Sequence, residues 1–181
     1  NYLDENLWKL TAAKKLLNIF ENCKTTLEDV AEIFNGIQTS AERPPVYWFS
    51  QDELVSENEK IVSIKKFGKV YNIEKNILKP YFKPTKKNEK GQESYSILKT
   101  DKRIIFPYDT EGKLIDIQTM KSNFMETFRY FSDCYDLLAP ACLNHGKGRN
   151  IKNATDETWY QYGRTQALTC FINRPKLIVK V

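Results

Sequence analysis

One pattern constrains the fold of this chain more than any other: apolar residues recur every three or four positions between residues 117 and 138. The series is Ile117, Met120, Phe124, Phe128, Phe131, Tyr135 and Leu138. Side chains at this spacing lie on one face of an α-helix. The pattern therefore predicts one long helix, or two helices in series, with an aromatic face buried on a sheet. The aromatic rings could instead line a cofactor site, but the helical spacing favours core packing, and Pro140 is expected to end or kink the helix.

Short β-rich runs, separated by proline, glycine, asparagine and charged clusters, occupy the middle of the chain and supply that sheet. The predicted strands are Val46–Phe49, Lys60–Ile64, Lys69–Ile73, Tyr95–Leu98 and Arg103–Phe106. Together with the helical pattern they predict an α+β fold, in which a long amphipathic helix pair packs on a central mixed or antiparallel sheet. The polar, basic segment Lys83–Gln92 has no periodicity, so we expect a surface loop there.

The two ends of the chain also carry regular patterns. Apolar spacing over Asp4–Asn22 predicts an amphipathic helix with a basic outer face. Thr26, followed three residues later by Asp29, predicts one capped helical turn. Ala31–Phe34 should then extend as a strand, although its spacing also fits a helix, and a final strand is expected at Lys176–Val181. The chain starts without Met inside a predicted helix and stops inside a predicted strand, so we expect a fragment of a longer protein.

Composition narrows the class of protein. With 181 residues, 41% of them hydrophobic and 13% aromatic, the chain can bury a core of its own. Its net charge of +5 favours a polyanionic partner only weakly. No apolar run approaches the roughly 20 residues needed to cross a bilayer, and no signal peptide is present. We therefore expect a cytoplasmic protein that does not associate with membranes.

Signatures of catalysis and of metal binding are absent from the sequence. Cys23, Cys134, Cys142 and Cys170 form no CxxC pair, and His145 is the single histidine, so we expect most of the cysteines to be reduced and buried. The chain contains no GxGxxG, Walker, GxSxG or HExxH motif. Two acidic pairs, Glu28–Asp29 and Asp156–Glu157, could serve a metal-dependent nuclease, but helix capping and solvation explain them better. We expect no catalytic residue, no bound metal and no cofactor within this chain.

What remains are two loops with side chains suited to reading nucleic acid. In Asn35–Ser40, followed by Arg43, Gly36 permits a tight turn beside short polar side chains. In Trp159–Gln166, arginine can bind guanine and glutamine can bind adenine, each through two hydrogen bonds. The first loop could also be an ordinary polar turn. In the second, the aromatic rings could cap the core while the arginine holds a carboxylate.

These loops and the lysines of the chain give two sets of candidate DNA contacts. The candidates for base reading are Gln38, Thr39, Ser40, Arg43, Tyr160, Arg164 and Gln166. The candidates for the sugar-phosphate backbone are Lys79, Lys83, Lys86, Lys87, Lys147 and Arg149. The last two belong to Asn144–Asn153, a glycine-containing segment with little apolar content that we expect to be a flexible basic loop.

Five segments resemble, in order, the TaqI-like C-terminal specificity domain, which is the target recognition domain of adenine-N6 DNA methyltransferases and of fused type IIG restriction-modification enzymes. The segments are Leu27–Thr39, Leu78–Phe82, Ile104–Tyr108, Trp159–Gln166 with its Gly163-Arg164-x-Gln166 core, and Arg174–Val179. Similar openings occur in type I specificity subunits. The chain departs from the family at Ser40, where a glycine is usual after the threonine.

The resemblance implies a division of labour. Residues 25–181 would form the target recognition domain and grip double-stranded DNA. Residues 1–24 would form a helical connector from an upstream methyltransferase domain, absent here, that binds S-adenosylmethionine and holds the catalytic motif. Two alternatives stay open at this stage: an RNA-binding or protein-interaction module, suggested by the many aromatic residues, and a small metal-dependent nuclease that uses Glu28 and Asp29.

Overall fold

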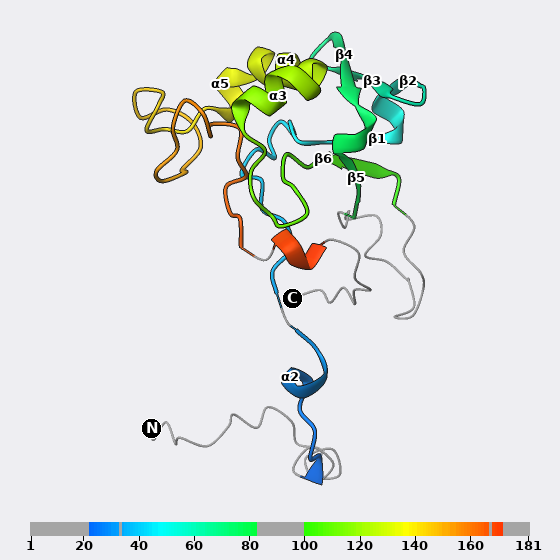
Figure 1. Ribbon diagram of the computed structural model, residues 1–181, viewed down its shortest axis with the longest axis vertical. Helices are drawn as coiled ribbons and strands as arrows, with labels where there is room; N and C mark the ends of the chain where they lie inside the picture. Colours follow the sequence, from blue (N-terminus) through cyan, green and yellow to red (C-terminus); the bar gives the residue numbers. More distant parts are fainter. Residues whose placement is uncertain (1–21, 33, 83–99, 167, 172–181) are drawn as a thin grey trace. The chain divides into compact units, whose positions relative to one another are not determined.

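Figure 1 shows the computed structural model of the chain, which describes residues 22–32, 34–82, 100–166 and 168–171. The chain divides into two compact units, residues 1–35 and residues 36–181. Apart from Asn22, the predicted N-terminal helix lies outside the described residues. So do the predicted loop Lys83–Gln92 and the predicted strands Tyr95–Leu98 and Lys176–Val181.

The first unit contains the short helix α2, Leu27–Val30. The main-chain N–H and the hydroxyl of Thr26 donate to Asp29 Oδ2 at 2.7 and 2.8 Å, which confirms the predicted capped turn. The same hydrogen bonds lower the pKa of the Asp29 carboxyl below its usual value. The strand predicted at Ala31–Phe34 is wrong for residues 31, 32 and 34. Ala31 and Glu32 are both exposed, so the segment buries no alternating face that would fix it as a strand.

Within the described part of the second unit, short strands build two three-stranded antiparallel sheets, with strand orders β1-β6-β5 and β2-β3-β4. The strands are β1 (Trp48–Ser50), β2 (Leu54–Glu57), β3 (Ile61–Lys66), β4 (Lys69–Glu74), β5 (Leu78–Tyr81) and β6 (Lys102–Ile105). Strands β3, β4 and β6 match the predicted runs closely and β1 overlaps its run. Strands β2 and β5 were not predicted.

The single central sheet of the prediction is wrong because two 3-10 turns carry the chain between separate sheets. Turn η1, Gln51–Glu53, joins β1 to β2, and turn η2, Lys75–Ile77, joins β4 to β5. Glu53 Oε2 accepts a hydrogen bond of 3.0 Å from the main-chain N–H of Ser50, which fixes the first crossing.

The periodic stretch is helical, as predicted, but the expected long helix pair is wrong. It forms three short helices, α3 (Ile117–Asn123), α4 (Met125–Asp133) and α5 (Tyr135–Leu138). The chain leaves helical geometry at Phe124 (φ −130°, ψ 45°) and at Cys134 (φ −95°, ψ 14°). At Ala139 it becomes extended, which is the usual conformation before a proline.

Helix α4 packs on β4 and is held there by a carboxylate from the strand. Glu74 Oε1 accepts from the main-chain N–H of Glu126 at 2.8 Å, and Glu74 Oε2 accepts from the N–H of Thr127 at 2.9 Å. A carboxylate at this helix end is favourable because the first N–H groups of a helix have no partner within it. Phe131 and Tyr130 of the helix are then buried in the core.

Candidate nucleic-acid interface

The two loops that the sequence singles out lie side by side (Figure 1). The N–H of Arg164 donates to the carbonyl of Gln38 and the N–H of Gly163 donates to the carbonyl of Thr39, both at 3.1 Å. Gln38 and Arg164 form an isolated antiparallel bridge, and both residues are exposed. Opposite residues in such a bridge have Cβ atoms about 5 Å apart. The Gln38 amide and the Arg164 guanidinium therefore project to solvent from neighbouring positions.

Ser40 and Gly163 bring the loops into close contact. A Cβ atom on Gly163 would collide with the side chain of Ser40, so only glycine fits there. Ser40 itself has φ 58°, in the left-handed region that favours glycine. This is the position at which the resemblance expects a glycine, a residue that adopts this conformation without strain.

Arg149 is buried beneath the paired loops, with only 6% of its surface exposed. Its guanidinium donates to the carbonyls of Leu138 (2.5 Å), Thr39 (3.1 Å), Gln161 (2.7 Å) and Trp159 (2.6 Å). The prediction that Arg149 contacts DNA phosphates is therefore not supported by its position, because the side chain is buried and donates four hydrogen bonds inside the protein. Arg149 instead ties both loops to the end of α5.

The segment Asn144–Asn153, expected to be a flexible basic loop, is fixed to the helix end at this point. The N–H of Arg149 donates to the carbonyl of Ala139 at 3.0 Å, and the N–H of Ala141 donates to the carbonyl of Arg149 at 2.9 Å. Gly148 has φ 118°, and a Cβ atom there would collide with the Ala139 carbonyl. Glycine thus allows the close approach that turns Arg149 inward.

Buried tyrosines hold the second loop from below. Tyr47 donates to the carbonyl of Tyr160 at 2.8 Å, Tyr162 donates to the carbonyl of Ile105 at 2.5 Å, and Tyr108 accepts from the N–H of Tyr162 at 2.6 Å. Burial raises the pKa of these three tyrosines above the usual value, so their hydroxyls stay protonated.

Two predicted base readers belong to this framework. Tyr160 is fully buried and donates to the carbonyl of Ile115 at 2.5 Å. Thr39 is also fully buried, and its hydroxyl donates to Glu42 Oε1 at 2.7 Å. Neither side chain reaches the surface, since the packing that holds the loops together covers both.

The remaining predicted base readers are exposed. They are Gln38, Ser40, Arg43, Arg164 and Gln166. Within the part of the chain that the structure describes, Arg164 forms no ion pair with a carboxylate, so that alternative is wrong for the described residues. Trp159 and Tyr162 do belong to the core, as the same alternative expected.

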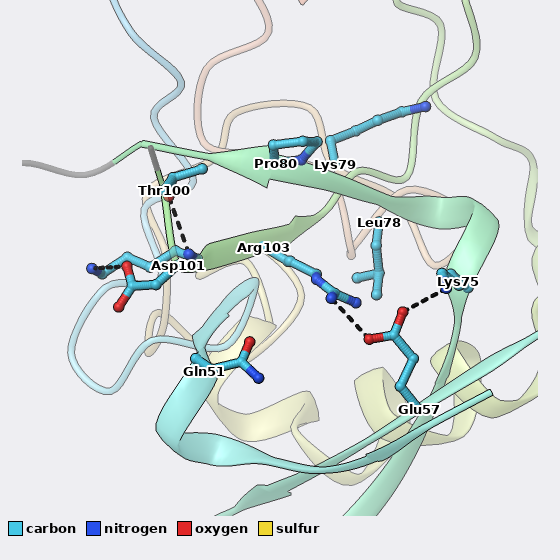
Figure 2. A pocket seen from close by; sticks show the side chains of 10 residues that line it. Gln51, Glu57, Lys75, Leu78, Lys79, Pro80, Thr100, Asp101 and Arg103 are labelled. Carbon is cyan, nitrogen blue, oxygen red and sulfur yellow. Dashed lines mark hydrogen bonds and ion pairs between the residues drawn. The ribbon is translucent and has the colours of Figure 1, made fainter. Parts of the chain in front are cut away.

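The predicted backbone contacts are dispersed. Lys79 and Lys147 are exposed, whereas Lys83, Lys86 and Lys87 lie outside the described residues. Lys79 lines an open groove between β5–β6 and η1–β2, whose other residues the sequence did not suggest (Figure 2). Two cations of this groove, Lys75 and Arg103, both form ion pairs with Glu57. No local pattern in the sequence indicates these contacts.

Other expectations concern metals, cysteines and membranes. Among the described residues, no group of three or more His, Cys, Asp or Glu side chains could hold a metal ion. Cys134 is buried, but Cys23 and Cys142 are exposed, so burial of most cysteines is wrong for the three whose side chains are described. The Cys142 thiol still lies 3.6 Å from the Ile151 carbonyl. No helix in the described ranges is long and apolar enough to span a membrane.

Comparison with known proteins finds a relative that matches nearly the whole chain. The chain is 29% identical over 193 aligned residues to the type II restriction enzyme and methyltransferase RM.Eco57I of Escherichia coli. The match covers 99% of this chain and 18% of that protein, so the chain spans less than a fifth of its relative's length. No family model and no solved structure matches the chain. The chain is therefore related to part of a restriction-modification enzyme, as the sequence segments suggested.

Proposed function

We propose that this chain reads a short base sequence in double-stranded DNA as the target recognition part of a restriction-modification enzyme, and that it has no catalytic centre of its own. The observation that carries the proposal is the pairing of Gln38 with Arg164. It places two side chains of the types that read adenine and guanine next to each other on the surface.

The geometry suits direct readout. Arginine binds the O6 and N7 atoms of guanine, and glutamine binds the N6 and N7 atoms of adenine, both from the major groove. Successive base pairs are about 3.4 Å apart, which is comparable with the Cβ separation of about 5 Å expected across the Gln38–Arg164 bridge. Ser40, Arg43 and Gln166 are exposed beside this pair in sequence and offer further polar groups.

A rigid support under the readers strengthens the proposal. The carbonyls of Thr39 and Gln161, one in each loop, accept from the same guanidinium of Arg149. Base-reading side chains on a fixed main chain lose little conformational entropy on binding. A fixed main chain therefore favours sequence-specific over non-specific binding to DNA.

In the parent enzyme, the chemistry would take place elsewhere. We infer that residues 25–181 hold the duplex in register while a methyltransferase domain of the same polypeptide, reached through residues 1–24, binds S-adenosylmethionine and acts on an adenine turned out of the helix. This chain needs no cofactor for that role.

The test is selection from a pool of duplexes with randomised sequence, followed by sequencing of the bound fraction. The unmodified chain should enrich one motif. Arg164→Ala should relax selection at one base position and weaken binding to the enriched duplex by about 1 to 3 kcal/mol.

Arg129→Ala is the matched control, because Arg129 is an exposed arginine on α4 paired with Glu126; it should leave the enriched motif unchanged. The proposal fails if no motif is enriched, or if Arg164→Ala weakens binding to every duplex equally. Equal competition by RNA would favour an RNA-binding module, and cleavage of DNA with magnesium or manganese by the isolated chain would favour a nuclease.

A further inference from the structure

A second charged region lies in the groove between β5–β6 and η1–β2. Four cationic side chains line it against two carboxylates, which leaves an excess of two positive charges. The cations are Lys75, Lys79, Lys102 and Arg103, and the carboxylates are Glu57 and Asp101. Figure 2 shows Lys75 and Arg103 meeting the same carboxylate, that of Glu57, with Gln51 of η1 directed into the same space.

The Glu57 carboxylate occupies the position of an anion ligand. Its Oε1 lies 2.6 Å from Lys75 Nζ, and its Oε2 lies 2.8 Å from Arg103 Nη2. These contacts lower the pKa of Glu57 to about 2, mainly through the hydrogen bond from Arg103, so the group is ionised at neutral pH. Lys75 and Arg103 thus already bind a two-oxygen anion with one negative charge, which is the charge and donor requirement of a phosphodiester.

The pairs are accessible to a competing anion. The side chains of Glu57, Arg103 and Lys75 are 23%, 31% and 45% exposed, and ion pairs at that exposure contribute little to stability. Lys79 is exposed on β5 and lines the groove, so it adds positive charge there.

The groove and the paired loops are built on the same strand. Arg103 belongs to β6, and the carbonyl of Ile105, two residues further along, accepts the hydroxyl of Tyr162. Two strand residues span about 7 Å, and Tyr162 precedes Gly163 and Arg164 directly. Strand β6 therefore carries both Arg103 of the groove and the carbonyl that holds Tyr162 of the second loop.

We propose that the groove binds a backbone phosphate of duplex DNA through Lys75 and Arg103, and that Glu57 is the internal counter-ion which keeps the two cations in place until the phosphate displaces it. The choice of DNA as the partner rests on the proposed function. The placement of the site rests on the ion-pair geometry of the groove.

The experiment measures the affinity of the full chain for one duplex of fixed sequence over a series of salt concentrations. Glu57→Gln removes the competing anion and should tighten binding about two- to fivefold, the range that exposed ion pairs permit. Lys75→Ala and Arg103→Ala should each weaken binding and make the salt dependence shallower by about one unit of the log–log slope.

Glu126→Gln is the matched control, because Glu126 also pairs with an arginine at 2.8 Å but lies on α4 and does not line the groove. The two variants change the net charge equally. A larger gain in DNA affinity for Glu57→Gln than for Glu126→Gln therefore indicates binding in the groove. In an Arg103→Ala background the gain from Glu57→Gln should shrink, since one of the two released cations is gone. Thermal unfolding of each variant checks that the fold is retained.

Each outcome bears on the proposal. Equal gains in DNA affinity for Glu57→Gln and Glu126→Gln would overturn the proposal. If Glu57→Gln does not fold, an unchanged salt slope for Lys75→Ala would overturn it instead. A gain seen with inorganic phosphate at matched ionic strength but not with duplex DNA would replace it with a free-anion site. If a sequence motif is still enriched from the random pool while the groove variants have no effect, only the groove is wrong; if the chain binds no duplex at all, the proposed function fails as well.

Discussion

The segments around Arg149 and Arg164 look alike in sequence and differ in structure. Each carries an arginine directly after a glycine, and each was expected to contact DNA. Arg149 turns inward and bonds to four carbonyls, whereas Arg164 pairs through its main chain and exposes its side chain. The glycine before each arginine allows a different close contact. Gly148 lies against the carbonyl of Ala139, whereas Gly163 lies against the side chain of Ser40. Basic character alone therefore does not distinguish a buried, supporting arginine from an exposed one.

Among these tests of the comparison, Arg149→Ala should have the largest effect. The substitution leaves carbonyl groups that Arg149 now satisfies without a donor in the core, so we expect it to lower the free energy of unfolding by about 3 to 5 kcal/mol. Urea denaturation measures this. Arg164→Ala should change the same quantity by less than about 0.5 kcal/mol, as an exposed substitution does. Similar losses for the two variants would erase the distinction between the segments.

Gly163→Ala should have the next largest effect. The added methyl group collides with Ser40, and we expect a loss of about 1 to 3 kcal/mol together with weaker sequence selection. Ser40→Gly in the same chain removes the colliding side chain and relieves the left-handed conformation, so the double variant should recover most of the stability. A double variant no more stable than Gly163→Ala would show that the loops do not meet at these residues.

Tyr47→Phe probes the support under the second loop. It removes the hydroxyl that donates to the carbonyl of Tyr160, at an expected cost of about 1 kcal/mol. We expect no change in the salt dependence of DNA binding, because no charge is altered. Thermal unfolding and a salt titration measure the two quantities, and a changed salt slope would contradict a purely supporting role.

Lys147→Ala should have the smallest effect. Lys147 is exposed in the supporting segment, and we expect unfolding to change by less than about 0.5 kcal/mol. If that segment does not read bases, the motif enriched from the random pool should stay the same. A new preference at any base position would show that the segment containing Lys147 and Arg149 also takes part in base recognition.

Sequence reasoning located the helical stretch and the capped turn because both depend on neighbours within four residues. It missed the breaks at Phe124 and Cys134 and the short strands β2 and β5, whose geometry depends on distant partners. The loops of the candidate site were chosen from side-chain type, which indicates what a residue can bind. Type does not indicate burial, and so Arg149, Tyr160 and Thr39 were assigned to the surface.

The groove illustrates the same limit. Glu57 and Arg103 are separated by 46 residues, and each is unremarkable in its own segment. Their meeting follows from β6 lying between β1 and β5 and from turn η1 leading the chain into β2. Only the assembled sheets place the two charges within hydrogen-bonding distance.

The bridge between Gln38 and Arg164 is made by main-chain atoms, which every amino acid except proline supplies. The side chains at these two positions can therefore be exchanged while Arg149 and the tyrosines keep the loops in place. Under the proposed function, a protein built in this way would acquire a new target by a few surface substitutions, without a new fold and with little change in stability. Selection of a variant library at these two positions against altered duplexes would exploit that separation.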